Sequence, residues 1–249
     1  MTLFFTKSVL VFDMKSCLPI VAAILVAGCA SISVQPMLNT SSRRGAERPR
    51  EIIVSDFTIP QTATIRVDRS GGKLSEFENT LIATLRQSLM EDLRPFGIPV
   101  RAIKPAEEEA LHKSTRPAWL ITGQITKVNQ GSRALRILIG VGTGGTKEET
   151  KVRVYDLSVP GTAKSRPILE FKTTGGSNAE PGVVFSAGPS LISSGVSAGV
   201  TVITSGLHGV SEDTRRTARM IANYVSEEMA VRGVIPADRV RKAKHLGAK

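Results

Sequence analysis

The chain has 249 residues, of which 41% are hydrophobic and 4% aromatic, and it carries a formal net charge of +11 at pH 7. This length and apolar content are sufficient for one sizeable domain or two small ones. The scarcity of aromatic residues argues against a surface that stacks nucleic-acid bases and against a sugar-binding groove lined with rings. The excess of Lys and Arg favours an anionic partner, and nucleic acid, acidic lipid and polyanionic glycan all fit it.

The first segment of the chain has the layout of a secretory signal peptide. Lys15 supplies a positive charge, residues 18–26 form a short apolar run, and the small residues Ala27 and Gly28 precede Cys29. This pattern is typical of a leader, and the run is shorter than the roughly 20 apolar residues of a membrane-spanning helix. The last four residues of the stretch, VAGC, resemble a bacterial lipobox. That resemblance implies cleavage after Gly28 and attachment of diacylglycerol and palmitate to the Cys29 thiol.

Two features of the leader bear on where the protein begins and where it goes. Residues 1–13 place a second apolar patch ahead of the leader, so we expect residues 1–28 to be a lipoprotein signal peptide with its true start at Met14. Ala30 and Ser31 follow the cysteine, with no Asp just after it. By resemblance to sorted lipoproteins, this favours the outer membrane, with the domain facing the periplasm. Such a location in the cell envelope disfavours nucleic acid as a partner.

Two other interpretations of Cys29 stay open. One is an ordinary leader that is cut elsewhere, which would leave a chance cysteine. The other is a cytosolic disulfide or metal pair with Cys17. The second is the less favoured, because both cysteines lie in or beside the apolar run.

Beyond the cysteine, the chain divides by composition into a tether, a domain and a tail. Residues 29–50 contain Ser, Asn, Gly, Pro and several Arg and predict a flexible basic tether. Residues 51–235 predict a single domain, and residues 236–249 predict a mobile basic tail. Within the domain, apolar or alternating runs predict strands at 51–57, 98–103, 119–128, 132–139, 151–157 and 167–173.

Three stretches of the domain have helical patterns. Ser75 and Glu78 have the spacing of a capping box, and leucines at intervals of three or four continue toward the stop signal at Gly97. A short helix is expected at 105–113 and a long one at 211–232. The order of these elements, with hairpin-like links between the later strands, predicts a two-layer α+β fold. It would have one mixed, mostly antiparallel sheet with helices packed on one face.

Two short motifs are typical of enzymes, but each lacks its context. Residues 140–145 spell G-x-G-x-x-G, yet the residues that follow predict a strand and not the helix that a dinucleotide site needs. Residues 195–199 spell G-x-S-x-G around Ser197, but the strand and helix of a hydrolase elbow are missing, and only His208 and His245 follow. No His, Asp and Glu cluster has metal spacing. We therefore expect no catalytic residue, metal or cofactor, and keep a serine hydrolase at Ser197 as an alternative.

Residues 181–211 contain no Asp, Glu, Lys or Arg, which is unusual in so basic a chain. If the segment is helical, Gly188, Gly195, Gly199 and Gly206 fall on one face, and small residues four apart permit close helix packing. Such a helix needs a protein or lipid surface to cover it, because Gly, Ser, Thr and Val are poor helix formers in water. A glycine-rich loop folded over the sheet is the other interpretation.

Residues 131–157, GSRALRILIGVGTGGTKEETKVRVYDL, resemble a bacterial lipoprotein family, domain of unknown function 4410. VSDFTIP at 54–60 and WLITGQITKVNQ at 119–130 fit the same family, as does a closing helix after a glycine-rich stretch. The likeness covers most of residues 51–232, and its motifs are structural. The family has no assigned activity, so the resemblance implies an anchored envelope protein and assigns no site residues.

Together these features predict a membrane-anchored envelope lipoprotein that is not an enzyme. We expect its domain to bind, or to help assemble, another envelope component, either a protein or an anionic glycan or lipid. The alternatives are an oligomer that inserts into the membrane through residues 181–211 and the hydrolase at Ser197.

Overall fold

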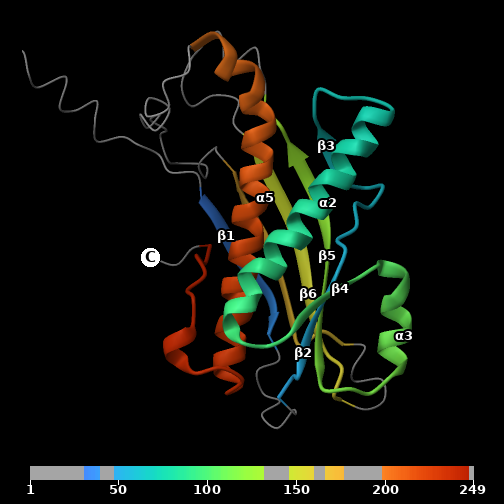
Figure 1. Ribbon diagram of the computed structural model, residues 1–249, viewed down its shortest axis with the longest axis vertical. Helices are drawn as coiled ribbons and strands as arrows, with labels where there is room; N and C mark the ends of the chain where they lie inside the picture. Colours follow the sequence, from blue (N-terminus) through green and yellow to red (C-terminus); the bar gives the residue numbers. More distant parts are fainter. Residues whose placement is uncertain (1–30, 40–47, 132–145, 160–165, 177–197, 247–249) are drawn as a thin grey trace, which may run out of the picture.

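The chain forms one mixed β-sheet with two long helices lying across it (Figure 1). The computed structural model describes residues 31–39, 48–131, 146–159, 166–176 and 198–246, with only the backbone described at residue 31 and over 198–209. The strands are β1 (Ser31–Asn39), β2 (Glu51–Ser55), β3 (Thr64–Arg66), β4 (Val100–Ile103), β5 (Ala118–Asn129), β6 (Lys147–Asp156) and β7 (Leu169–Gly176). The helices are α2 (Gly72–Leu93), α3 (Glu108–Lys113) and α5 (Ala198–Val231), with short 3-10 helices at η1 (Arg94–Phe96), η2 (Pro105–Glu107) and η4 (Ala237–Arg239).

The sheet has the strand order β1-β7-β6-β5-β2-β4, and β3 pairs with the last residues of β5. Strands β1, β7, β6 and β5 form an antiparallel run, whereas β2 pairs in parallel with both β5 and β4. Strands β5, β6 and β7 follow one another along the chain as a meander, as the hairpin-like links predict. The predicted α+β class with one mixed sheet is therefore confirmed.

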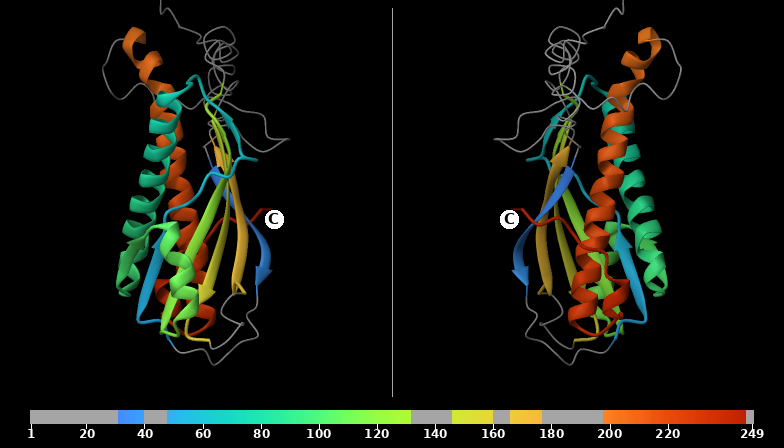
Figure 2. Two further views of the ribbon diagram at one scale, coloured as in Figure 1. Left: turned by 90° about the vertical axis from the view of Figure 1, so that its right-hand side faces the viewer. Right: turned by 90° about the vertical axis from the view of Figure 1, so that its left-hand side faces the viewer.

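The long helices α2 and α5 lie on the same side of the sheet (Figure 2). Every second strand residue points toward them, because successive side chains of a strand project to opposite faces. Trp119 and Phe171 of the sheet are at most 1% exposed beneath the helices, and burial of each such side chain contributes about 1.5–3 kcal/mol. The apolar stripes predicted on the two helices are confirmed. Their buried residues include Leu81, Leu85, Leu89, Ala218, Ile221, Val225 and Met229.

The short helix α3 packs on the other face of the sheet. Ile53 and Leu120 belong to a second, smaller cluster of buried residues, against which Leu111 of α3 packs. They alternate along their strands with Ile52 and Trp119, which belong to the main core beneath the long helices. The prediction that the helices pack on one face of the sheet is therefore correct for α2 and α5, whereas α3 covers part of the opposite face.

The segment expected to be a tether contains a strand. Residues 31–39 form β1, which pairs antiparallel with β7 over its length. The prediction of a flexible tether over 29–50 is therefore wrong for these residues. Ile32 and Val34 are buried at 3% and 0% exposure, and polar residues alternate with them. This alternation of apolar and polar residues is short, and the surrounding Ser, Asn and Pro concealed it.

The last helix is longer than predicted, because it begins at Ala198 and not at Ser211. The helical interpretation of the uncharged segment therefore holds for residues 198–211, while residues 181–197 lie outside the described part. The low helix propensities of Gly, Ser and Thr suggested a boundary at Ser211, but propensity is a weak prior that tertiary context overrides. Helix α2 also begins earlier than the predicted cap at Ser75, and no side-chain hydrogen bond caps it.

The C-terminal tail packs against the domain over most of its length, which corrects the prediction of a mobile tail at 236–249. The backbone N–H of Val34 on β1 donates to the carbonyl oxygen of Lys244 at 2.7 Å. A side-chain oxygen of Glu227 on α5 lies 2.9 Å from Nε2 of His245. These contacts hold the tail along the outer edge of β1.

Two further differences concern strands. The strand predicted at 132–139 lies outside the described residues. Strand β3 is only three residues long, too short for an alternating pattern to predict it. The other predicted strands and the short helix at 105–113 agree with the structure to within a few residues.

Candidate functional site

The face of the sheet opposite α2 and α5 carries a ladder of charged side chains on β5, β6 and β7. Residues of β6 alternate between buried and partly exposed along the whole strand. The strand register aligns the partly exposed residues in rows across the three strands. We call this surface the open face. Its charged residues are Lys127, Lys147, Glu149, Lys151, Arg153, Glu170 and Lys172.

Two lysines share the carboxylate of Glu149 on the open face. Oε1 of Glu149 lies 3.0 Å from Nζ of Lys147 and 3.7 Å from Nζ of Lys127. All three side chains are partly exposed, and an exposed ion pair contributes only about 0–1 kcal/mol to stability. Because one negative charge serves two positive ones, a net positive charge remains at this position.

Glu170 of β7 is shared in the same way by two cations of β6. Its Oε1 lies 2.7 Å from Nζ of Lys151 and 3.2 Å from Nε of Arg153. The hydrogen bond from Lys151 lowers the pKa of Glu170, against the weaker opposing effect of burial. Glu170 is therefore ionised at neutral pH, and one of its two cations remains uncompensated.

Lys172 adds a further positive charge beside this cluster. It lies directly opposite Lys151 in the antiparallel pair of β6 and β7. Like charges directly opposite each other destabilise a strand pair. Lys172 is exposed, and no ion pair is found for it within the described part of the chain. The open face thus concentrates uncompensated positive charge along β6 and β7.

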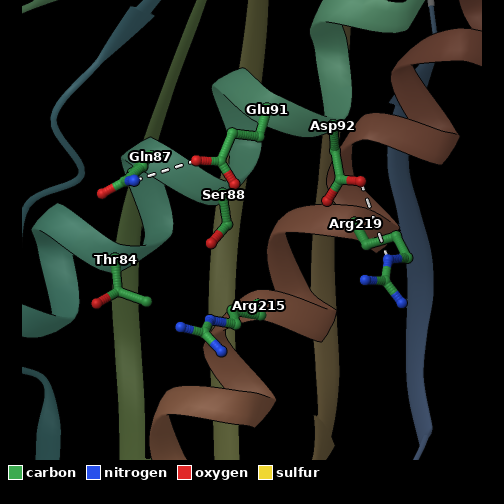
Figure 3. A pocket seen from close by; sticks show the side chains of 7 residues that line it. All are labelled: Thr84, Gln87, Ser88, Glu91, Asp92, Arg215 and Arg219. Atoms are coloured by element: carbon green, nitrogen blue, oxygen red, sulfur yellow. Dashed lines mark hydrogen bonds and ion pairs between the residues drawn. The ribbon is translucent and has the colours of Figure 1, made fainter.

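A polar groove lies between α2 and α5, on the side of the helices away from the sheet (Figure 3). Its volume is about 290 Å³. In Figure 3, polar and acidic side chains of α2 form one wall, and two arginines of α5 form the other. The lining residues are Thr84, Gln87, Ser88, Glu91, Asp92, Arg215 and Arg219.

Most charges of the groove have partners within it or beside it. Asp92 lies 3.9 Å from Arg219 and 3.5 Å from Arg241. Burial raises the pKa of Asp92, although both arginines act in the opposite direction. Arg215 lies 3.9 Å from Glu212 on the preceding turn of its own helix. The groove therefore offers less uncompensated charge than the open face.

Two buried acids join the sheet to α5. Glu148 is 1% exposed and accepts a hydrogen bond from Oγ1 of Thr214 at 2.7 Å. Asp213 accepts a hydrogen bond from Thr146 and lies 3.2 Å from Nη1 of Arg216. Burial raises the pKa of Glu148 to about 7 and also raises the pKa of Asp213. Because both acids are enclosed between helix and sheet, they bear on stability and not on ligand binding.

Most site residues predicted from the sequence lie outside the described residues. Gly199 and Gly206 are on the backbone of α5, in the part where side chains are not described. His245, one of the two histidines that follow Ser197, contacts Glu227 in the packed tail. The predicted residues outside the described ranges are Gly28, Cys29, Gly188, Gly195 and Ser197.

The described part of the chain shows neither a metal-binding cluster nor a helix suited to crossing a membrane. There, no group of three or more His, Cys, Asp or Glu side chains is placed to hold a metal ion. None of the helices that the structure describes is both long and apolar enough to cross a membrane.

The open face was missed at the sequence level, although part of its signal is present there. In KVRVYDL, Lys151 and Arg153 alternate with valines, and in PILEFKT, Glu170 and Lys172 alternate with apolar residues. Alternation predicts that such charges share a face of their strand. It does not predict which strands are neighbours, in which register they pair, or which face the helices leave uncovered.

Comparison with solved structures finds remote likeness, and no curated protein matches the chain. A PelC dodecamer from Paraburkholderia phytofirmans is 10% identical, with 74% of this chain and 96% of that chain covered and a TM-score of 0.35. A neuraminyllactose-binding hemagglutinin homolog from Helicobacter pylori is also 10% identical, with 78% and 93% covered and a TM-score of 0.40.

Family membership is clearer than structural likeness. A family model matches residues 52–194, which is more than half of the chain. The match runs from β2 to beyond β7 and so includes every charged residue of the open face. The chain therefore belongs to the family described as domain of unknown function (DUF4410).

Proposed function

We propose that this protein is a lipid-anchored lipoprotein of the bacterial envelope, without enzymatic activity, that binds another envelope component through its open face. The position of β1 is the observation that carries the proposal. The strand begins at Ser31, two residues after Cys29, and is paired with β7. A lipid on Cys29 would then be attached almost directly to the sheet, and the domain would be held close to the membrane.

The register identifies the end of the sheet that would face the membrane. Ser31 pairs with Gly176, Gly176 pairs with Lys147, and Lys147 pairs with Asn129. These four residues form a row across one end of the sheet. The strands would therefore extend away from the bilayer, and the open face would stand upright beside the membrane. A charged face held in this way is suited to binding an anionic component of the envelope.

Metabolic labelling tests the anchor. The full chain, expressed in a bacterium, should incorporate radiolabelled palmitate and fractionate with membranes, whereas Cys29→Ala should lose the label and leave the membrane fraction. Cys17→Ala is the matched control, because Cys17 lies within the leader, and it should be labelled like the wild type. Unlabelled wild-type protein, or a Cys29→Ala variant that fractionates as before, would contradict the proposal.

A second candidate is an oligomer that inserts into the membrane through residues 181–211. It is favoured by the start of α5 at Ala198, which makes part of this uncharged segment helical. Gly199 and Gly206 are seven residues apart and so fall on one face of that helix. Crosslinking in native membranes should then give discrete ladders, whereas monomers alone would count against it.

A further inference from the structure

The pairing of Lys151 with Lys172 is the feature of the open face that the fold itself does not explain. The two residues are directly opposite in the strand pair, where side chains lie about 5 Å apart at Cβ. Glu170 binds Lys151, but it is also occupied by Arg153. Two positive charges at this distance repel each other, and an anion between them would remove the repulsion.

The cations extend along the strands. Lys147, Lys151 and Arg153 lie on the same face of β6, and a strand rises about 3.4 Å per residue. The series from Lys147 to Arg153 therefore spans about 20 Å. A ligand that contacts the whole series has to be elongated and to carry several negative charges.

The direction of this series distinguishes among anionic ligands. Lys147 lies in the row that contains Ser31, and Arg153 lies farther along the strand. With the anchor at Cys29, lipid headgroups would reach only the Lys147 end, whereas a polymer leaving the membrane would follow the whole series. This step rests on the proposed function, because it uses the anchored orientation.

Two other classes of partner fit the open face less well. Single-stranded nucleic acid is bound by aromatic rings on which bases stack, but Tyr155, at the end of this face, already packs edge-on against His112 with ring centres 4.8 Å apart. A protein partner would need apolar residues at the centre of the contact. The large apolar residues exposed in the described part of the chain lie on β1, at the end of α5 and in the tail. They are Met37, Leu38, Val231 and Leu246.

We propose that the open face binds a linear anionic polysaccharide of the envelope, with Lys151 and Lys172 together holding one of its carboxylate or phosphate groups. Lys147 and Arg153 contact the charged groups on either side along the polymer. Recognition is by charge and not by ring stacking. The affinity should therefore fall steeply with salt, as it does for other polyelectrolytes that release counterions on binding.

The test measures binding of polygalacturonate, a linear polyuronate, to the purified chain by calorimetry, with uncharged dextran as the reference polymer. We expect Lys151→Gln/Lys172→Gln to weaken binding about tenfold. The matched control is Lys73→Gln/Lys113→Gln, which removes the same charge from the exposed positions of α2 and α3. It should leave the affinity nearly unchanged. Urea unfolding should show the Lys151/Lys172 variant to be close to the wild type in stability, because the repulsion that is removed offsets the lost ion pair between Lys151 and Glu170.

Three results would overturn the inference. They are failure of the wild type to bind polygalacturonate in preference to dextran, equal losses in the two double variants, and tighter binding to phosphatidylglycerol vesicles that depends on the same two lysines. The measurement is made on the lipidated chain in detergent and on its Cys29→Ala form. If neither form binds polygalacturonate, the polysaccharide site is rejected. The anchor is tested separately by the palmitate experiment, so the two proposals can fail independently.

Discussion

Glu148 and Glu149 are neighbours on β6, but they lie on opposite faces of the sheet. Glu148 is 1% exposed beneath α5, where its Oε1 atom has no hydrogen-bond partner among the described residues. Burial raises its pKa to about 7. Glu149 lies on the open face between Lys127 and Lys147. These adjacent acids therefore differ in their surroundings. Glu148 is enclosed in the protein, whereas Glu149 is partly exposed and forms ion pairs with two lysines.

This comparison shows how differently the two faces of one sheet can be used. The covered face holds the core, and some of its polar groups are paired locally, as in the hydrogen bond between the buried hydroxyls of Thr150 and Thr173. The open face contributes little to stability, because its ion pairs are partly exposed and shared. Its charges are therefore available for binding, and substitutions on the two faces should have separable effects.

The largest effect is expected from truncating a core residue of the covered face. Phe171 is fully buried and packs edge-on against Tyr224, with ring centres 4.8 Å apart. Phe171→Ala should lower the free energy of unfolding by about 3–5 kcal/mol, because it removes this contact and leaves a cavity. Urea denaturation measures the change. Lys172→Ala, one residue away on the open face, is the control and should change stability by less than about 0.5 kcal/mol; similar losses in both would contradict the comparison.

A smaller and pH-dependent effect is expected at Glu148. Its pKa is about 7 in the folded chain and near the ordinary 4.5 when unfolded, so the folded state holds more protons between these values. The free energy of unfolding should therefore fall as the pH rises from about 4.5 to about 7. Glu148→Gln should remove most of this fall and be more stable than the wild type by about 2–3 kcal/mol at high pH.

Denaturation at pH 5 and at pH 8 tests the prediction for Glu148. Some dependence of the free energy of unfolding on pH should persist in the variant. Burial also raises the pKa of Asp213, and this too lowers stability as the pH rises. A Glu148→Gln chain that is less stable than the wild type at both pH values would show that the carboxylate is stabilised by its surroundings.

The smallest effect is expected at Glu149. Glu149→Gln removes two partly exposed ion pairs, at 3.0 Å and 3.7 Å. The loss of stability should be at most about 1 kcal/mol, because such pairs are screened by water and salt. Urea denaturation of Glu148→Gln and Glu149→Gln side by side measures the difference between the two faces. A loss of more than about 3 kcal/mol in the free energy of unfolding of Glu149→Gln would contradict the comparison.

Much of the fold was predictable from local patterns, but the candidate site was not. The stripe of leucines on α2 and the alternation in KVRVYDL each predict an element and the side that it buries. β1 was missed because its buried pair, Ile32 and Val34, lies among residues typical of a tether. The start of α5 was missed because Gly, Ser and Thr disfavour helices in isolation.

The packing of the tail illustrates a different kind of failure. Residues 236–249 are basic and lack a long apolar pattern, which favours mobility at a chain end. The order of the described part of the tail, which ends at residue 246, comes from hydrogen bonds to the backbone of Val34 and to the side chain of Glu227. Such partners are distant in sequence, so no local pattern in the tail reveals them.

By itself, the sequence determined the α+β class, the two long amphipathic helices, the basic charge and the family to which the chain belongs. These properties depend on composition and on periods of two or about 3.6 residues, which are local. Only the tertiary structure decided that Lys151 lies opposite Lys172, on the face of the sheet away from the long helices α2 and α5. Register and layer packing bring together residues from different strands, and that juxtaposition, which no single stretch of sequence contains, makes the open face a candidate site.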